Sequence, residues 1–417
     1  MIIRTGNLRI SGLSLYQYEE DYIMQKRILV PNGNYTDIRL IKAFKKMGFY
    51  VITSGNAPEL LGHQYADEYI PHDYSDKEGM LELAKSLNLD YISACSNDFG
   101  VVTAAYIAEK LGLPGHDTFR SAQIIAEKDH FKKFAQENGL QVIPSHYFED
   151  ADTALTFCKK AEYPLIVKPT DLGGGKGVTR IDGIDEAKEA IDYAFRVSKA
   201  KHIVIEPFVV GEQASFSGFL VKGKVVTYTS FNEYDAYNNP FLVGYTTSPA
   251  NDMEHVSKVM IEQTEKMAEL LHLADGIFHI QYRMWNGEPY IMECMRRCLG
   301  NYALRGASYL SEIEWEEWIA KAYCGMDCSD IPCIDDSAKN VAEYYIQVPH
   351  NGIVKNVRID PIIDKYTYDS IMQWTPGMEI TNAKTAMLGF IFMDFPTREL
   401  RDEIASKFDQ YIVVEME

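Results

Sequence analysis

The glycine-rich segment 164–178 carries the clearest chemical signal in the sequence. Its four loop glycines are Gly173, Gly174, Gly175 and Gly177. Glycines leave backbone N–H groups unobstructed, and such groups suit phosphate oxygens. The loop is not a Walker P-loop, because that motif needs Ser or Thr after its lysine and then a helix, whereas Gly177 and a strand follow Lys176. The glycines alone also fit a flexible surface turn.

Lys168 and Glu206 stand on the strands that flank this loop. Lys168 shares a strand face with Ile166, so its ammonium lies beside apolar surface and requires an anionic partner. The strand 203–205 ends at Glu206 and Pro207. Proline donates no hydrogen bond, so the chain after it can leave the sheet and offer backbone groups to a flat heterocycle. Many strands end in this way, so the Glu206-Pro207 pattern alone does not specify a heterocycle-binding site.

A hairpin around Asn286-Gly287 contains the third group of polar residues. Four residues share one face of its first strand, namely Ile277, His279, Gln281 and Arg283. The opposite face is apolar and predicts a core position. The polar face predicts the wall of a cleft, although His279 is better explained as a structural histidine.

Gln281 and Glu293 could hold a magnesium ion if the hairpin brings their oxygens together. A two-residue turn at Asn286-Gly287 would place them on opposite faces, whereas a three-residue loop with Gly287 in a bulge would place them on one face, diagonally. Because magnesium requires its oxygen ligands together, the metal interpretation selects the bulged loop. The alternative for Glu293 is a salt bridge to Arg296 or Arg297.

The elements that position these residues begin with an alternation of strands and helices over residues 27–115. Strands are expected at 28–30, 49–53 and 91–95, and helices at 37–48, 76–88 and 99–111. This order implies a parallel sheet covered on both faces. The first turn lacks G-x-G-x-x-G, which disfavours a hydride-transfer enzyme. Asn97 and Asp98 follow a strand end, where a small ligand could still bind.

The pattern changes near residue 120. Further elements are expected as a single helix at 121–138, hairpins at 214–230 and 276–295, and helices at 252–272 and 311–323. Segment 231–250 is expected either to shape an acceptor pocket or to form a packed loop. A linker at 324–336 leads to a strand-rich segment, 337–417, with a helix at 397–408 and a last strand at 411–414.

Composition narrows the class of protein. A length of 417 residues suggests about three domains. The net charge of −19 disfavours nucleic-acid and membrane-surface binding. The seven cysteines form no C-x-x-C pair, which favours a reducing compartment and buried or half-buried thiols over a zinc site at 324–333. The sequence contains neither an apolar stretch of membrane-spanning length nor the apolar core of a signal peptide, and residues 1–23 are polar.

Lys128, Lys168, the glycine loop, Glu206 and the run from Gln281 to Arg297 follow one another in an order that resembles the ATP-grasp superfamily. The resemblance is to the branch with biotin carboxylase, carbamoyl-phosphate synthase and the bacterial L-amino-acid ligases. It covers residues 24–323 well and the last part loosely. It implies an α/β and α+β fold made of a Rossmann-like pre-ATP-grasp domain at 24–115, an ATP-grasp domain at 116–323 with a lid at about 141–210, and a small β-rich domain at 337–417.

The same resemblance assigns expected roles to single residues. Lys128 and Lys168 would hold the ATP phosphates beneath the glycine loop. The base and sugar would meet Glu206, Phe208, Val209 and Gln213. Gln281 and Glu293 would coordinate Mg²⁺, with Mn²⁺ as an alternative metal. Lys176 and Arg297 would be the catalytic residues, the first reaching the γ-phosphate and the second steadying an acyl phosphate or a substrate carboxylate.

Two positions depart from the superfamily pattern. Gln213 stands where an acidic residue commonly binds ribose, with Glu212 beside it. Met295 stands where an asparagine usually follows the metal-binding glutamate, and a thioether is a poor ligand for magnesium. Asn301 could replace it, or fewer protein ligands could hold a second metal.

The resemblance implies an ATP-dependent carboxylate–amine ligase that forms an amide through an acyl phosphate. Its partners would be a small carboxylate and a small amine, and a cytoplasmic homodimer is expected. The enzymatic alternative uses bicarbonate or formate, as in the purine-pathway relatives. The non-enzymatic alternative is a nucleotide-binding sensor, which Met295 favours and which intact Lys168, Glu293 and Arg297 disfavour.

Overall fold

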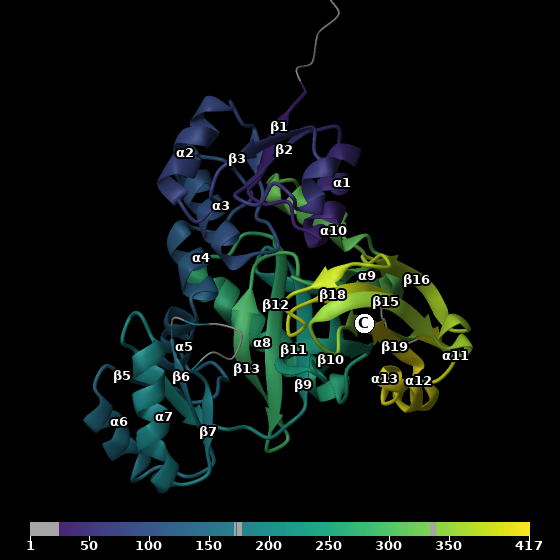
Figure 1. Ribbon diagram of the computed structural model, residues 1–417. Coiled ribbons are helices and arrows are strands. Elements are labelled where there is room, and N and C mark those ends of the chain that lie inside the picture. The colour runs from purple at the N-terminus through teal and green to yellow at the C-terminus, as the bar shows by residue number, and fades with distance from the viewer. Residues whose placement is uncertain (1–24, 171, 173–176, 334–338) are drawn as a thin grey trace, which may run out of the picture.

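The computed structural model describes residues 25–170, 172, 177–333 and 339–417, and these residues form four β-sheets with helices packed against them (Figure 1). The expected mixed α/β and α+β class is confirmed. No helix in the described ranges is long and apolar enough to cross a membrane. Segment 324–333 contains three cysteines, of which Cys324 and Cys328 are buried and Cys333 is exposed.

The first sheet is parallel and has the strand order β3-β2-β1-β4. Its strands are β1 (Arg27–Val30), β2 (Tyr50–Gly55), β3 (Glu68–Pro71) and β4 (Tyr91–Ile92). Its helices are η1 (Tyr35–Asp37), α1 (Ile38–Lys46), η2 (Leu61–Tyr65), α2 (Lys77–Ser86) and α3 (Asp98–Leu111). The Asn97 side chain caps α3, and Gly112 ends it in the left-handed region. The expected strand–helix alternation is confirmed.

The single helix expected at 121–138 is in fact two helices. They are α4 (Phe119–Ala126) and α5 (Lys128–Glu137). Glu127 between them has extended backbone angles, with φ −95° and ψ 113°, which end one helix and start the next. Lys128 therefore stands at the first position of α5 instead of inside a longer helix.

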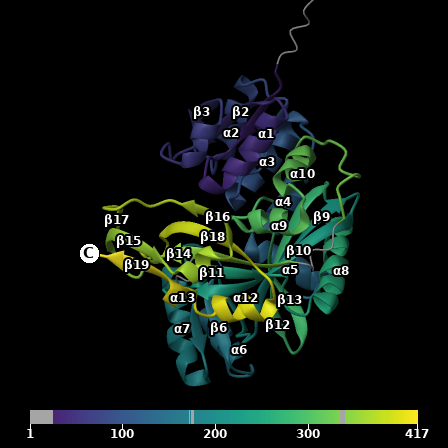
Figure 2. The same cartoon turned by 90° about the vertical axis from the view of Figure 1, so that its right-hand side faces the viewer.

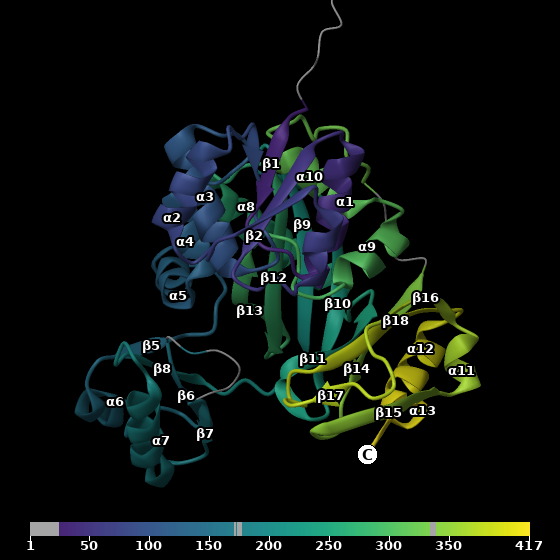
Figure 3. The same ribbon diagram turned by 45° about the horizontal axis from the view of Figure 1, so that its top comes forward.

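A second, antiparallel sheet with the order β5-β8-β6-β7, which we name the small sheet, projects from the rest of the chain (Figure 3). Its strands are β5 (His146–Phe148), β6 (Leu165–Pro169), β7 (Thr179–Ile181) and β8 (Ile203–Pro207). Helices α6 (Ala151–Cys158) and α7 (Ile184–Val197) bury its apolar face. The small sheet therefore has its own hydrophobic core.

The central sheet has eight antiparallel strands in the order β13-β12-β9-β10-β11-β14-β18-β16. Five of them are β9 (Gln213–Val221), β10 (Lys224–Ala236), β11 (Asn239–Ser248), β12 (Gly276–Trp285) and β13 (Glu288–Met295). Helix α8 (Met253–Leu271) covers one face, and α9 (Ala303–Ser311) and α10 (Trp315–Tyr323) pack against the other. Segment 231–250 is thus mostly strand and is not the packed loop of the second expectation, and Asn232, Glu233, Tyr234 and Asp235 line a cavity.

The C-terminal residues contribute to two sheets. Strands β14 (Asn340–Gln347), β16 (Thr367–Met372) and β18 (Met387–Phe395) extend the central sheet beyond β11 (Figure 2). A three-stranded sheet contains β15 (Gly352–Ile359), β17 (Glu379–Ile380) and β19 (Ile412–Met416). The remaining helices are α11 (Pro361–Asp364), α12 (Arg398–Ala405) and α13 (Phe408–Tyr411). Residues 339–417 therefore share hydrogen bonding with the central sheet, through the pairing of β11 with β14.

Glu343 on β14 is a fully buried acid at the seam between the central sheet and α9. A Cβ atom on Gly306 would lie 2.1 Å from its Oε1, so the carboxyl group packs against the α9 backbone. Oε1 has no hydrogen-bond partner in the described part of the chain, and Oε2 accepts a 3.5 Å bond from Tyr345 Oη. Burial raises the pKa of Glu343 to about 8. The Glu343 carboxyl group is therefore mostly protonated and uncharged in the folded protein at neutral pH.

We expect the contribution of Glu343 to the free energy of unfolding to fall as pH rises from about 4.5 to about 8, because over this range the unfolded carboxyl ionises before the folded one. Glu343→Gln should remove up to about 5 kcal/mol of this loss, since glutamine is neutral at every pH. Urea unfolding at pH 5, 7 and 8.5 checks the prediction. Glu379→Gln, an exposed change on β17, is the control. Parallel pH profiles for wild type and Glu343→Gln would contradict it.

Candidate active site

The β12–β13 hairpin turns through two residues, which corrects the three-residue loop expected from the sequence. Trp285 pairs with Glu288, and Asn286 and Gly287 have φ values of +52° and +82°. Two residues with positive φ form the turn type that follows the twist of a hairpin. The expectation of a bulge at Gly287 is therefore wrong.

Gln281 and Glu293 nevertheless lie directly opposite each other, because a bulge inside β13 shifts the register. Tyr282 pairs with Ile291 while Gln281 pairs with Glu293, so Met292 is the extra residue. A bulge of this kind moves all later side chains to the other face. Gln281 and Glu293 therefore lie on one face of the hairpin, as the metal interpretation requires. The bulge in β13, and not a three-residue turn, places them there, and they are directly opposite instead of diagonal.

Lys128 reaches the same point from α5. Its Nζ lies 3.0 Å from Glu293 Oε2, and the carboxylate raises the pKa of Lys128. The Glu293 side chain is 30% exposed, so its oxygens remain accessible beside the ammonium. The structure thus brings together three of the predicted site residues, namely Lys128, Gln281 and Glu293.

Glu233 on β10 is a member of this cluster that sequence reasoning missed. Its Oε2 accepts hydrogen bonds from Gln281 Nε2 at 2.9 Å and from Gln213 Nε2 at 3.0 Å. Burial raises the pKa of Glu233, and the hydrogen bonds only partly oppose this. Extending the Lys222-Gly223 hairpin without a bulge would set Gln213 opposite Asn232, but a register shift near Val226 sets it opposite Glu233. No residue pattern in the sequence marks that shift.

The polar face ends in an open cavity of about 370 Å³. Its lining includes Val210, Gly211, Glu212, Gln213, Asn232, Glu233, Tyr234, Asp235, Asn251 and Arg283. Arg283 Nη2 donates a 2.7 Å hydrogen bond to Gln213 Oε1, which fixes that amide in the wall. The cavity is large enough for part of a small ligand and is rich in hydrogen-bond acceptors.

A buried ionic group lies where the small sheet meets the central sheet. Lys168 Nζ lies 2.6 Å from Glu206 Oε2, so the anionic partner expected for Lys168 is Glu206. Ser145 Oγ donates to Glu206 Oε1, and Lys132 Nζ, a second residue missed from the sequence, lies 3.8 Å from that oxygen. Burial opposes ionisation of Glu206, but the two lysines and the hydrogen bonds hold its pKa below the usual value.

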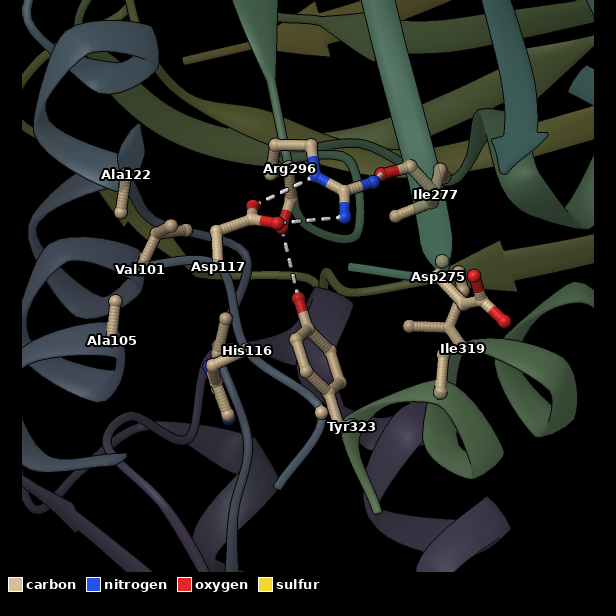
Figure 4. A pocket seen from close by; sticks show the side chains of 14 residues that line it. Val101, Ala105, His116, Asp117, Ala122, Asp275, Ile277, Arg296, Ile319 and Tyr323 are labelled. Atoms are coloured by element: carbon tan, nitrogen blue, oxygen red, sulfur yellow. Dashed lines mark hydrogen bonds and ion pairs between the residues drawn. The ribbon is translucent and has the colours of Figure 1, made fainter. Parts of the chain in front are cut away.

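Arg296 and Arg297 have partners other than Glu293, so the salt-bridge alternative for that glutamate is not observed. Arg296 binds Asp117 through Nε at 2.9 Å in a small pocket whose other lining residues are mostly apolar (Figure 4). Arg297 Nε lies 2.7 Å from Asp98 Oδ1 at the start of α3. Arg297 thus links the segment after β13 to the start of α3, beside Asn97 and Asp98, where the sequence predicted that a small ligand could bind.

Other predicted residues divide into three groups. Gly173, Gly174, Gly175 and Lys176 lie outside the described residues. Gly177 has a φ of +80°, and Val209 is buried next to exposed Val210. His279 is a buried structural histidine that contacts Ser217 Oγ at 2.7 Å, and burial lowers its pKa to about 3.

The structure also places Met295 and Asn301, the two residues considered at the second metal position. Met295 pairs with His279 across the hairpin. Asn301, considered as a replacement metal ligand, instead accepts a hydrogen bond from the Ala303 backbone N–H through its Oδ1, at 3.1 Å. Neither supplies an observed third ligand beside Glu293.

Comparison with known proteins adds a family match to this geometry. Residues 126–238 match the ATP-grasp (A) domain of phosphoribosylglycinamide synthetase. The matched range includes Lys128, Lys168, Glu206 and Gln213 but ends before the β12–β13 hairpin. The carbamoyl phosphate synthase large chain of Caldanaerobacter subterraneus subsp. tengcongensis is 22% identical over 271 residues, or 62% of this chain. That match spans only 24% of the relative, about a quarter of its length.

Two solved structures resemble nearly the whole chain. The L-amino acid ligase from Bacillus licheniformis has a TM-score of 0.76 at 18% identity, covering 94% of this chain and 99% of that one. The biotin carboxylase domain of Hydrogenobacter thermophilus 2-oxoglutarate carboxylase, solved with MgADP, ADP and bicarbonate, has a TM-score of 0.75 at 15% identity, covering 94% and 91%. The expected resemblance to this superfamily is confirmed at the level of the fold.

Proposed function

We propose that this chain, which has the ATP-grasp fold, is an ATP-dependent carboxylate–amine ligase. The observation that carries the proposal is the juxtaposition of Gln281 and Glu293 on one sheet face, with Lys128 Nζ 3.0 Å from the Glu293 carboxylate. Oxygen donors beside a lysine suit a divalent cation and the phosphates that it binds. The similarity to a solved L-amino acid ligase supports the same class of reaction.

ATP occupies the space between the small sheet and the central sheet. Its base lies near Glu206, Phe208 and Val209, and its sugar enters the 370 Å³ cavity, where Gln213 and neighbouring acids accept hydrogen bonds from hydroxyl groups. The ammonium groups of Lys168 and Lys128 then bind the phosphates. Both ammoniums are bound to carboxylates in the described structure, so nucleotide binding exchanges one anionic partner for another.

Mg²⁺ fits the donor set at Gln281 and Glu293. Both side chains offer hard oxygens, and the Glu293 side chain is 30% exposed. Met295 is a poor ligand for magnesium, so Gln281 and Glu293 would be the protein residues that hold the ion. The metal would neutralise phosphate charge during transfer.

The reaction has two displacements. A substrate carboxylate oxygen attacks the γ-phosphorus, the bond to the β-phosphate oxygen breaks, and ADP leaves with its electron pair. The amine nitrogen then attacks the acyl carbon, the C–O bond to phosphate breaks, and the nitrogen releases a proton. No side-chain nucleophile is required, and Arg297 steadies the acyl phosphate through charge.

Bicarbonate is the second candidate carboxyl substrate, because the similar biotin carboxylase domain was solved with that anion. In the purine-pathway version the acceptor carries its own phosphate and needs basic residues around it. Segment 231–250 contains no lysine or arginine, which disfavours that version. A homodimer and a cytoplasmic location remain predictions.

A matrix of amino acids and small carboxylates, tested in pairs with Mg-ATP, identifies the substrates through ADP release. We expect ADP release that depends on both partners in at least one pair. Release with bicarbonate and an amine alone would establish the alternative, and nucleotide binding without turnover in any pair would favour a sensor.

A further inference from the structure

Lys132 lies one helical turn after Lys128 on α5 but differs from it in burial. The Lys132 side chain is 6% exposed and that of Lys128 is 68% exposed. Lys132 Nζ lies 3.8 Å from Glu206 Oε1 on β8 and 3.5 Å from the backbone oxygen of Ile291 on β13. A single ammonium thus contacts the small sheet and the central sheet from a third element.

The contacts of Glu206 leave little freedom to its carboxylate. The side chain is 3% exposed, and an ionised carboxylate offers about four acceptor sites. Lys168 binds Oε2, while Ser145 and Lys132 approach Oε1. By this count, one acceptor site on Oε2 is left unused by these three side chains.

Lys168 and Lys132 differ in whether they can move away from Glu206 when a nucleotide binds. Lys168 is 29% exposed and can turn toward a phosphate, which takes its charge away from Glu206. Lys132 is enclosed and cannot leave. A buried carboxylate without a counter-ion is costly, so Lys132 is the charge that keeps Glu206 ionised in the bound state.

We infer that Lys132 is a positioning residue for base recognition, holding Glu206 as an ionised acceptor that selects a 6-amino purine over a 6-oxo purine. The inference rests on the proposed function, in which Glu206 faces the base. An ionised carboxylate only accepts hydrogen bonds, so it matches the amino group of adenine and repels the oxygen of guanine. A purely structural lysine would affect stability without changing this preference.

Calorimetric titration with the non-hydrolysable imido analogues of ATP and GTP tests the inference. Wild type should prefer the adenine analogue. Lys132→Met should weaken binding of the ATP analogue at least tenfold, about 1.4 kcal/mol. The ratio of the affinity for the ATP analogue to the affinity for the GTP analogue should fall by a similar factor. Lys133→Met, a neighbouring exposed lysine, is the matched control and should change neither value.

A charge-neutral double variant, Lys132→Met with Glu206→Gln, covers the case in which the single variant unfolds. Lys168 then remains as the charged member of this group, and because its side chain is 29% exposed water can solvate it, so the fold should persist. The amide can present either an acceptor or a donor, so the preference for adenine should disappear. If the folded single or double variant kept the wild-type ratio of ATP-analogue to GTP-analogue affinity, the inference would be overturned. Failure of wild type to bind either analogue would overturn the proposed function and the inference together.

Discussion

Glu293→Gln is expected to lower Mg²⁺-dependent ADP release by about 100-fold or more while the protein remains folded. A neutral amide binds magnesium far less well than a carboxylate does. The same change removes the ion pair with Lys128, whose Nζ lies 3.0 Å away. Because the Lys128 side chain is 68% exposed, water can solvate the freed ammonium and the cost to stability is small.

The control for Glu293 is Glu288→Gln on the same strand. Glu288 is exposed and contacts His255 instead of the site. ADP release measured across a magnesium titration should show a much higher metal requirement for Glu293→Gln and a wild-type curve for Glu288→Gln. Overlapping curves for Glu293→Gln and wild type would remove Glu293 from the metal site.

Arg297→Ala is expected to keep Mg-ATP binding and to lower ADP release by about 10²- to 10³-fold. The guanidinium is buried and aligned by Asp98 Oδ1 at 2.7 Å and by the Cys298 backbone oxygen at 3.0 Å. A preorganised cation of this kind stabilises charge that forms during transfer more than it stabilises the bound substrates. The loss should therefore appear in turnover more than in nucleotide affinity.

Arg297→Lys separates charge from geometry, because an ammonium cannot reproduce the planar fork of a guanidinium. It should recover little of the lost turnover. Arg305→Ala, which breaks a pair with Asp369 away from the site, serves as the control and should turn over at the wild-type rate. Equal losses of nucleotide binding and turnover in Arg297→Ala would show that Arg297 supports the fold instead of the transferred group.

Local sequence signals were sufficient for much of the architecture. Apolar Ile28, Leu29 and Val30 mark β1, Asn97 and Gly112 bound α3, and the Asn-Gly pairing at 286–287 marks a hairpin. The order along the chain of Lys128, Lys168, the glycine loop, Glu206 and the run from Gln281 to Arg297 indicates the superfamily. All of these features consist of residue types and their order along the chain, so the sequence shows them directly.

The details of the site depend on register and tertiary contact, which the sequence does not show. The bulge at Met292 carries no glycine or asparagine to mark it, yet it decides that Gln281 and Glu293 meet. Lys132 resembles any helix lysine until β8 and β13 enclose it. Strand β14 pairs with β11, a long-range contact that local patterns cannot specify.

The transfer of oxygen from the substrate carboxylate to phosphate is the most direct test of an acyl-phosphate ligase. The carboxylate identified in the substrate screen is labelled with ¹⁸O in both oxygens and turned over with Mg-ATP and its amine. Mass spectrometry of the released phosphate should then show one ¹⁸O atom per amide bond formed, with ADP as the nucleotide product. Unlabelled phosphate, or AMP carrying the label, would contradict phosphorylation of the carboxylate and with it the proposed reaction.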